Sequence, residues 1–182
     1  REINPQLTWA WIGKGYCLYS LGKYDEAIRA YDKAIELNPS VVEAWDGKGI
    51  TLGKMGKYNE AIQAYDKAIE IDPKYASAWN NKGNAFDNLG QYDAAIFSLS
   101  NAIQIDPTMT DAWNNTALVL NHKGNILLRQ DNYSYAIQAY DDAIKVNPKD
   151  IRAWYGKSLA LQALHRDAEA GYAFTTAKEL GL

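Results

Sequence analysis

The amino-acid sequence predicts an all-α fold, an α-solenoid of about ten antiparallel helices in five helix-turn-helix repeats. Two observations lead to this prediction: a residue pattern that returns at nearly constant intervals, and helical spacing inside each interval. Proline recurs at positions 5, 39, 73, 107 and 148, and tryptophan follows six residues later at positions 11, 45, 79, 113 and 154. The first three intervals are 34 residues long and the fourth is 41.

Within each interval, two runs of residues have the spacing of one helix face. In the first interval, Trp11, Gly15 and Leu18 stand at i, i+4 and i+7. Ala27 and Tyr31 begin the same spacing on a second helix. The small residues let two helix backbones approach, and the aromatic side chains fill the space beside them. Because one hairpin cannot cover its own apolar face, neighbouring hairpins are expected to stack and share a core.

Turn residues predict where the helices end. A glycine that favours a left-handed conformation is expected to close the first helix of the first three repeats, at Gly22, Gly56 and Gly90. Proline is expected to stop each second helix. Short polar side chains follow the glycine turns and are predicted to cap the second helices, at Asp25, Asn59, Asp93 and Ser134.

These residues together resemble the tetratricopeptide repeat family. Its pattern is a Trp, a small residue, a large apolar residue and a Tyr on one helix and turn, followed by Ala, an aromatic residue, Ala and Pro. The resemblance implies a right-handed superhelix whose first helices line a concave groove. It divides the chain into a remnant of an upstream repeat at residues 1–5 and five repeats at 6–39, 40–73, 74–107, 108–148 and 149–182.

The last two repeats depart from the pattern. The fourth has seven additional residues in its first helix, which is nearly two turns, so a single helix is predicted from about 109 to 130. These residues are either a tolerated insertion or a ledge that partners contact. The fifth repeat is a degenerate terminal unit, in which Ser158, Asp167 and Lys178 replace the Gly, Tyr and Ile of other repeats.

Composition and charge disfavour several classes of partner. The chain has 19 Lys and Arg against 22 Asp and Glu, a formal charge of −3, and no basic run, so nucleic acid is not an expected partner. No apolar run approaches the roughly 20 residues of a membrane-spanning helix. A single cysteine suits a reducing compartment, and the cytoplasm is the expected location. Because residue 1 is Arg and not Met, the alternative that a signal or anchor segment was removed stays open.

The sequence does not predict an enzyme. His122 and His165 are the only histidines, and neither has a second metal ligand at helical or finger spacing, so no metal and no cofactor are expected. Cys17 aligns with the small residues at positions 51, 85, 119 and 160 and is predicted to be a buried packing residue rather than a nucleophile.

The resemblance places a partner on the groove side of the first helices. The candidate binding residues are Trp9, Ile12, Tyr16, Tyr19, Glu43, Asp46, Asn80, Asn81, Asn84, Asp87, Asp111, Asn114, Asn115, Arg152 and Tyr155, with Asn121 one turn beyond. An aromatic end leads into an acidic, asparagine-rich middle, which favours a neutral or basic extended peptide or helix. Family members that bind a chaperone's C-terminal carboxylate use Lys and Arg at positions where this chain has Asp46, Asn80, Asn114 and Gly156.

The predicted function is a protein-interaction scaffold. One alternative is a substrate-recognition arm of a larger enzyme such as a glycosyltransferase. Another is a self-assembling structural module that associates through the exposed face of the N-terminal repeat. The aromatic residues of the first helix leave two readings open, because they could anchor a ligand or pack against an upstream repeat.

Overall fold

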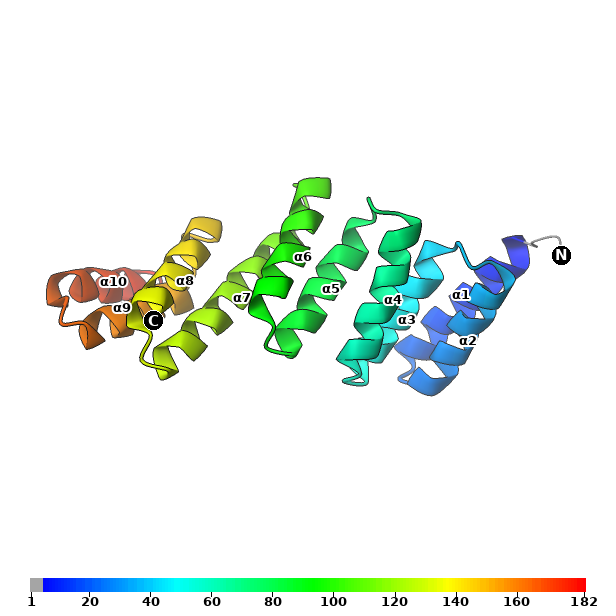
Figure 1. The fold of residues 1–182 in the computed structure, drawn as a ribbon, viewed down its shortest axis with the longest axis horizontal. Helices are drawn as coiled ribbons and strands as arrows, with labels where there is room; N and C mark the ends of the chain where they lie inside the picture. The colour runs from blue at the N-terminus through cyan, green and yellow to red at the C-terminus, as the bar shows by residue number, and fades with distance from the viewer. Residues whose placement is uncertain (1–4) are drawn as a thin grey trace. The chain divides into compact units, whose positions relative to one another are not determined.

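The computed structural model describes residues 5–182, and helices are the only regular elements in that range (Figure 1). This confirms the predicted all-α fold of ten helices. The remnant predicted at residues 1–5 lies outside the described residues except for Pro5. The helices are α1 (Pro5–Ser20), α2 (Tyr24–Leu37), α3 (Val42–Lys54), α4 (Tyr58–Ile71), α5 (Ala76–Asn88), α6 (Tyr92–Ile105), α7 (Thr110–Arg129), α8 (Tyr133–Val146), α9 (Ile151–Ala163) and α10 (Asp167–Glu179).

The helices form two compact units, Arg1–Pro107 and Thr108–Leu182. The first contains three antiparallel hairpins and the second contains two. Within each unit, every helix packs against the next helix along the chain. One cluster of the first unit joins Leu52 of α3 and Tyr65 of α4 to Ala78 of α5, with Ile28 of α2 packed against it. The prediction that neighbouring hairpins share a core is therefore confirmed inside this unit.

Glycine on the first helix allows the two helices of a hairpin to pack closely. A Cβ atom at Gly49 would lie 2.5 Å from Cε1 of Tyr65, and one at Gly124 would lie 2.6 Å from Cε1 of Tyr140. Such distances are shorter than real Cβ contacts, so the aromatic ring occupies the space that a side chain would need. In the third hairpin, Leu99 packs against Gly83 in the same way.

The turn inside each hairpin closes with a left-handed residue. Gly22 has φ +73°, and the amides at 22 and 23 donate to the carbonyls of Tyr19 and Leu18, the two hydrogen bonds of a Schellman motif. The glycine turns predicted in the first three repeats are confirmed. The last two repeats use Asp131 (φ +59°) and His165 (φ +55°) instead, two of the residue types best able to adopt this conformation after glycine.

The predicted caps of the second helices are wrong. Four of these helices begin two residues earlier than the pattern suggests, and the residues before them, Lys23, Lys57, Gln91 and Asn132, make no side-chain cap hydrogen bond. Asp25 lies in the first turn of α2, where a negative charge is favoured by the helix dipole. The Schellman turn sets the start of the helix, so a capping side chain is not required.

The long first helix of the fourth repeat is present as predicted, because α7 runs without interruption from Thr110 to Arg129. Leu120 is buried, whereas Trp113 one heptad earlier is partly exposed. In the last hairpin, the second helix α10 buries only Ala173 and Ala177. Two of the polar substitutions noted in the fifth repeat, Asp167 and Lys178, thus lie on a helix that is mostly exposed to solvent, whereas Ser158 lies on α9 and is buried.

Candidate functional site

The first helices form the inner side of each unit. In the first unit α1 contacts α3 and α3 contacts α5, whereas among the described residues the second helices contact only first helices. In the second unit α7 contacts α9 in the same manner. A stack of hairpins curves toward the side on which its helices lie closer together. The candidate binding residues all belong to these first helices, and each unit has its own part of the inner side.

The inner side of the first unit contains a hollow of about 490 Å³ between α3, α4 and α5. Gly53 opens it, because the same position carries Tyr19 in the first repeat and Asp87 in the third. Asn84 faces this hollow, and so does Asn81. The residues that line it are Ile50, Gly53, Lys54, Tyr58, Tyr65, Asn81, Asn84, Ala85 and Asn88. Sequence reasoning missed Lys54 and Asn88, which are the last residues of their helices and directly follow Gly53 and Asp87.

Asp46 is not presented to a partner, because it lies beneath the inner surface with only 7% of the residue exposed. Its Oδ1 accepts a hydrogen bond from Nδ2 of Asn81 at 3.0 Å, and the hydroxyl of Tyr75 also donates to it. Asn80, 9% exposed, donates to Oδ1 of Asn81 at 3.4 Å. Two predicted binding residues thus support Asn81 from below, and their direct contact with a partner stays a prediction.

Burial determines the protonation of this network. It raises the pKa of Asp46 above its ordinary value, an effect that the hydrogen bonds from Asn81 and Tyr75 oppose and the charge of Glu43 reinforces. Burial also raises the pKa of Tyr75 to about 12, so its hydroxyl stays a donor at neutral pH. The site therefore contains a carboxyl group whose burial favours the neutral form and whose two hydrogen bonds favour the charged form.

Replacing Asp46 by Asn is expected to stabilise the first unit at neutral pH and to flatten its pH dependence. Because the folded pKa of Asp46 lies above its unfolded value of about 3.8, the folded state binds more protons, and stability falls as pH rises through the folded pKa. Asp46→Asn removes this slope while an amide oxygen still accepts from Asn81. Urea unfolding midpoints at several pH values from about 4 to about 7 test this; parallel curves for the two proteins would contradict it.

The aromatic residues of α1 differ in exposure. Trp9 and Tyr16 are 53% and 66% exposed, whereas Ile12 and Tyr19 pack against the core cluster that contains Tyr31. Tyr16 and Trp9 therefore supply most of the exposed aromatic surface at this end of the first unit.

In the second unit the candidate residues are spread along α7 and α9. Asp111, Asn114 and Arg152 are exposed, and Asn115 is partly buried. The ring of Tyr155 lies 6.3 Å from that of Phe174, at the edge of a hollow of about 500 Å³ between α9 and α10. Asn121 does not belong to this surface, because it is 2% exposed and its Nδ2 donates to Oδ2 of Asp150 at 2.7 Å.

Cys17 is exposed, so the prediction that it is a buried packing residue is wrong. The equivalent residues Thr51, Ala85 and Ala160 are buried, and each has a preceding hairpin packed over it. Among residues 5–182 no such hairpin covers α1. In the same range, no group of three or more His, Cys, Asp and Glu side chains could hold a metal ion. The helices described also include none with the length and apolar character required to cross a membrane.

Comparison with known proteins identifies the class. The chain matches the family described as Tetratricopeptide repeat at residues 8–41, 76–109 and 117–150, a second family of that description at 30–63, and TPR repeat at 51–90. This chain belongs to the tetratricopeptide repeat family. No curated protein sequence matches it.

Solved structures of the same class resemble most of the chain. A crystal structure of MamA protein is similar with a TM-score of 0.75 and 29% identity, covering 97% of this chain and 93% of the other. A second MamA structure has a TM-score of 0.70 and 30% identity over 91% and 93%. YrrB, a TPR protein described as having an unusual peptide-binding site, has a TM-score of 0.70 at 20% identity over 94% and 84%, which shows the shared fold.

Proposed function

We propose that this chain is a protein-interaction module that holds an extended peptide or a helix of another protein against its first helices. The observation that carries the proposal is the hollow of about 490 Å³ on the inner side of the first unit. Asn84 faces it with an amide that can both donate to and accept from a peptide backbone, whatever the peptide's sequence. Gly53 leaves room there for a side chain of the partner.

Two relatives support this use of the surface. YrrB is described as having a peptide-binding site, and the first TPR domain of Spaghetti (RPAP3) is described as bound to the HSP90 peptide SRMEEVD. The latter peptide is rich in acidic residues. Each unit has an exposed acid on a first helix, Glu43 in the first unit and Asp111 in the second, so we propose a neutral or basic partner. No feature of the described residues favours the alternative of an enzyme's substrate arm.

The test is a selection from a library of random extended peptides, followed by affinity measurement with two independent variants. Asn84→Ala removes the amide, and Gly53→Leu fills the hollow; a Cβ atom at Gly53 meets only the Tyr65 hydroxyl, 3.9 Å away. Each variant is expected to weaken binding by about tenfold, the effect of about one lost hydrogen bond or one lost side-chain site.

The control is Gln63→Ala, an exposed residue on the outer helix α4. It should leave affinity unchanged, and all three variants should unfold at similar urea concentrations. Unchanged binding by both Asn84→Ala and Gly53→Leu would reject this hollow as the site. Preference of the selected peptides for acidic residues would reject the proposed partner chemistry.

A further inference from the structure

At two junctions between successive hairpins, a tyrosine of the second helix covers a glycine of the next first helix: a Cβ atom at Gly47 would lie 2.6 Å from Cε1 of Tyr31, and one at Gly156 would lie 2.5 Å from Cε1 of Tyr140. At the junction of α4 and α5 the equivalent position is Asn81. The equivalent residue of α1 is Gly13, two residues after its tryptophan. A Cβ atom there would meet nothing within 4 Å. The helix thus has the glycine of a junction without the tyrosine.

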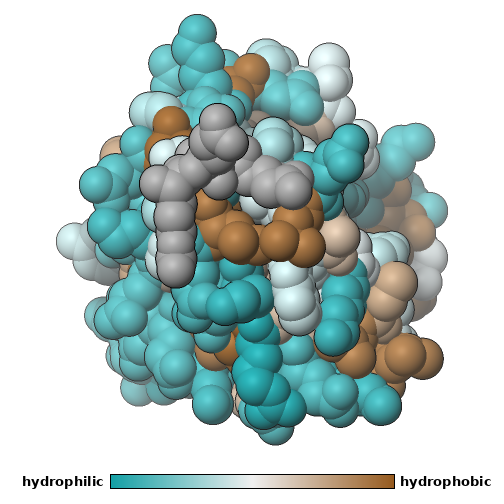
Figure 2. Space-filling view, turned by 90° about the vertical axis from the view of Figure 1, so that its right-hand side faces the viewer, coloured by the Kyte–Doolittle hydropathy of each residue, from teal (hydrophilic) through white to brown (hydrophobic). Residues whose placement is uncertain are grey.

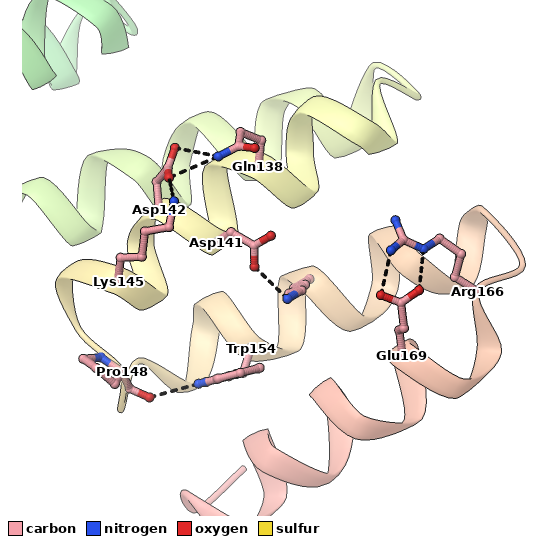
Figure 3. Close-up of polar contacts among 9 residues, drawn as sticks. Gln138, Asp141, Asp142, Lys145, Pro148, Trp154, Arg166 and Glu169 are labelled. Carbon is pink, nitrogen blue, oxygen red and sulfur yellow. Dashed lines mark hydrogen bonds and ion pairs between the residues drawn. The ribbon is translucent and has the colours of Figure 1, made fainter.

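An ion pair accompanies each tyrosine. The aspartate that follows the tyrosine pairs with the lysine that follows the glycine position, at 2.6 Å in Lys48–Asp32, Lys82–Asp66 and Lys157–Asp141. Figure 3 shows Asp141 of α8 directed toward α9, where Trp154 donates to the carbonyl of Pro148. The equivalent lysine of α1 is Lys14, which lies over the ring of Trp11 and has no carboxylate paired with it in the described range.

The exposure of two further residues of α1 is a third difference from the equivalent first helices. Ala10 is exposed, although the equivalent alanines at 44, 78, 112 and 153 are completely buried. Cys17 is exposed where its equivalents are buried. Figure 2 looks onto this end of the first unit and shows apolar surface at its centre, framed by hydrophilic side chains. The exposed residues are those that a preceding second helix would cover.

We propose that the outer face of α1 docks the second helix of a further repeat, one that carries a Tyr-Asp pair. The tyrosine fits over Gly13, the aspartate pairs with Lys14, and the helix covers Ala10 and Cys17. The occupant is a helix with the sequence pattern of α2, because residues 2–5 read Glu-Ile-Asn-Pro and match Glu-Leu-Asn-Pro at 36–39, the sequence by which α2 leads into α3.

A second copy of the chain is a poorer occupant. The last helix α10 has Gly171, Thr175 and Lys178 where α2 has Ile28, Asp32 and Ile35. It therefore lacks the aspartate for Lys14 and two of the apolar contacts, although Phe174 stands at the tyrosine position. The polar end of the second unit does not complement the outer face of α1.

The test uses the single cysteine as a reporter. The sequence of residues 22–35 is joined directly before Glu2 in the full chain, so that it supplies the helix and its Tyr-Asp pair. Alkylation of Cys17 by iodoacetamide under native conditions is expected to slow by about tenfold or more, because reaction then requires local opening. The original chain should react at the same rate at all protein concentrations.

Two variants test the details of docking. Replacing the added Tyr-Asp pair by Ala-Lys, or Gly13 by Leu, should restore fast alkylation in the extended chain. Gly13→Leu should not lower the unfolding midpoint of the original chain, since that position is open and leucine favours a helix more than glycine does. Equal rates with and without the added helix would overturn the proposal. Protection that rises with concentration of the original chain would also overturn it, in favour of a second copy.

A second experiment uses a separate peptide and does not depend on folding of the extended chain. The peptide of residues 22–39 is added at millimolar concentration to the original chain and to its Gly13→Leu variant. Slower alkylation in the original chain alone supports the proposed fit over Gly13. Equal slowing in both proteins would show that the glycine does not receive the tyrosine, and absence of slowing in either would count against docking.

Discussion

Replacing Tyr140 by Ala is expected to lower the free energy of unfolding of the second unit by about 3–5 kcal/mol, the range observed when a buried aromatic side chain is truncated in a core. The ring is completely buried between the backbones of two helices, α7 at Gly124 and α9 at Gly156. Because glycine has no side chain to move into the space, the cavity stays open on both sides. Urea unfolding monitored by far-UV circular dichroism measures the loss.

Tyr140→Phe separates the ring from its hydroxyl. The hydroxyl donates to Oδ1 of Asn125 at 2.8 Å, and burial raises the pKa of Tyr140 to about 12, so it remains a donor at neutral pH. Loss of this one hydrogen bond is expected to cost about 1 kcal/mol. If Tyr140→Ala were no more destabilising than Tyr140→Phe, the packing of the ring between two helices could not be what holds the unit together.

The repeat pattern predicted these packing residues because steric fit repeats with the sequence. Trp, Gly, Ala and Tyr recur where the helices of a hairpin approach, with Leu99 at the tyrosine position of the third hairpin and Ser158 at the glycine position of the fifth, so one interpretation covers most hairpins. The turns at Asp131 and His165 lie outside this rule, since a left-handed backbone is compatible with several residues and the sequence alone does not mark it. The capping prediction failed for a related reason: the glycine turn already fixes the helix start.

Exposure of the candidate site could be predicted only in part. Helical spacing places Asp46, Asn80 and Asn84 on one side of the first helices, but it does not determine how deeply a neighbouring hairpin covers each of them. Asp46 is covered because Tyr75 and Asn81 of the next hairpin bond to it. Asn121 is likewise buried by a partner 29 residues away, Asp150. Contacts of this kind depend on tertiary packing that periodicity does not describe.

Asp150 is the residue whose loss is expected to have the second large effect on the second unit. It is 5% exposed, and its Oδ1 accepts from the backbone amide of Arg152 at 3.0 Å, which caps α9. Its Oδ2 accepts from Nδ2 of Asn121 on α7 at 2.7 Å. A single carboxylate therefore closes the start of one helix and joins it to another.

Asp150→Ala is expected to destabilise the unit by about 2–4 kcal/mol, because it removes a cap and leaves a buried amide hydrogen without a partner. Asp150→Asn keeps an oxygen at the cap, where Asn and Asp act almost equally well, but it replaces Oδ2, the acceptor of Asn121, by an amide donor. It should therefore cost about 1 kcal/mol less than Asp150→Ala, the contribution of the cap that it keeps. The two values are obtained from urea unfolding of each variant. A similar loss in both would mean that the hydrogen bond to Asn121, and not the cap, dominates.

A double-mutant cycle with Asn121→Leu shows how much of the effect belongs to the pair. Oδ1 of Asn121 is buried without a hydrogen-bond partner among the described residues. The asparagine is therefore held in place by the two hydrogen bonds that its Nδ2 donates, one to Asp150 and one to the carbonyl of Ala117. Once Asp150 is alanine, an apolar side chain at 121 no longer leaves a polar group unpaired. The double variant should therefore be more stable than Asp150→Ala alone, and strictly additive losses would show that the two residues are not coupled.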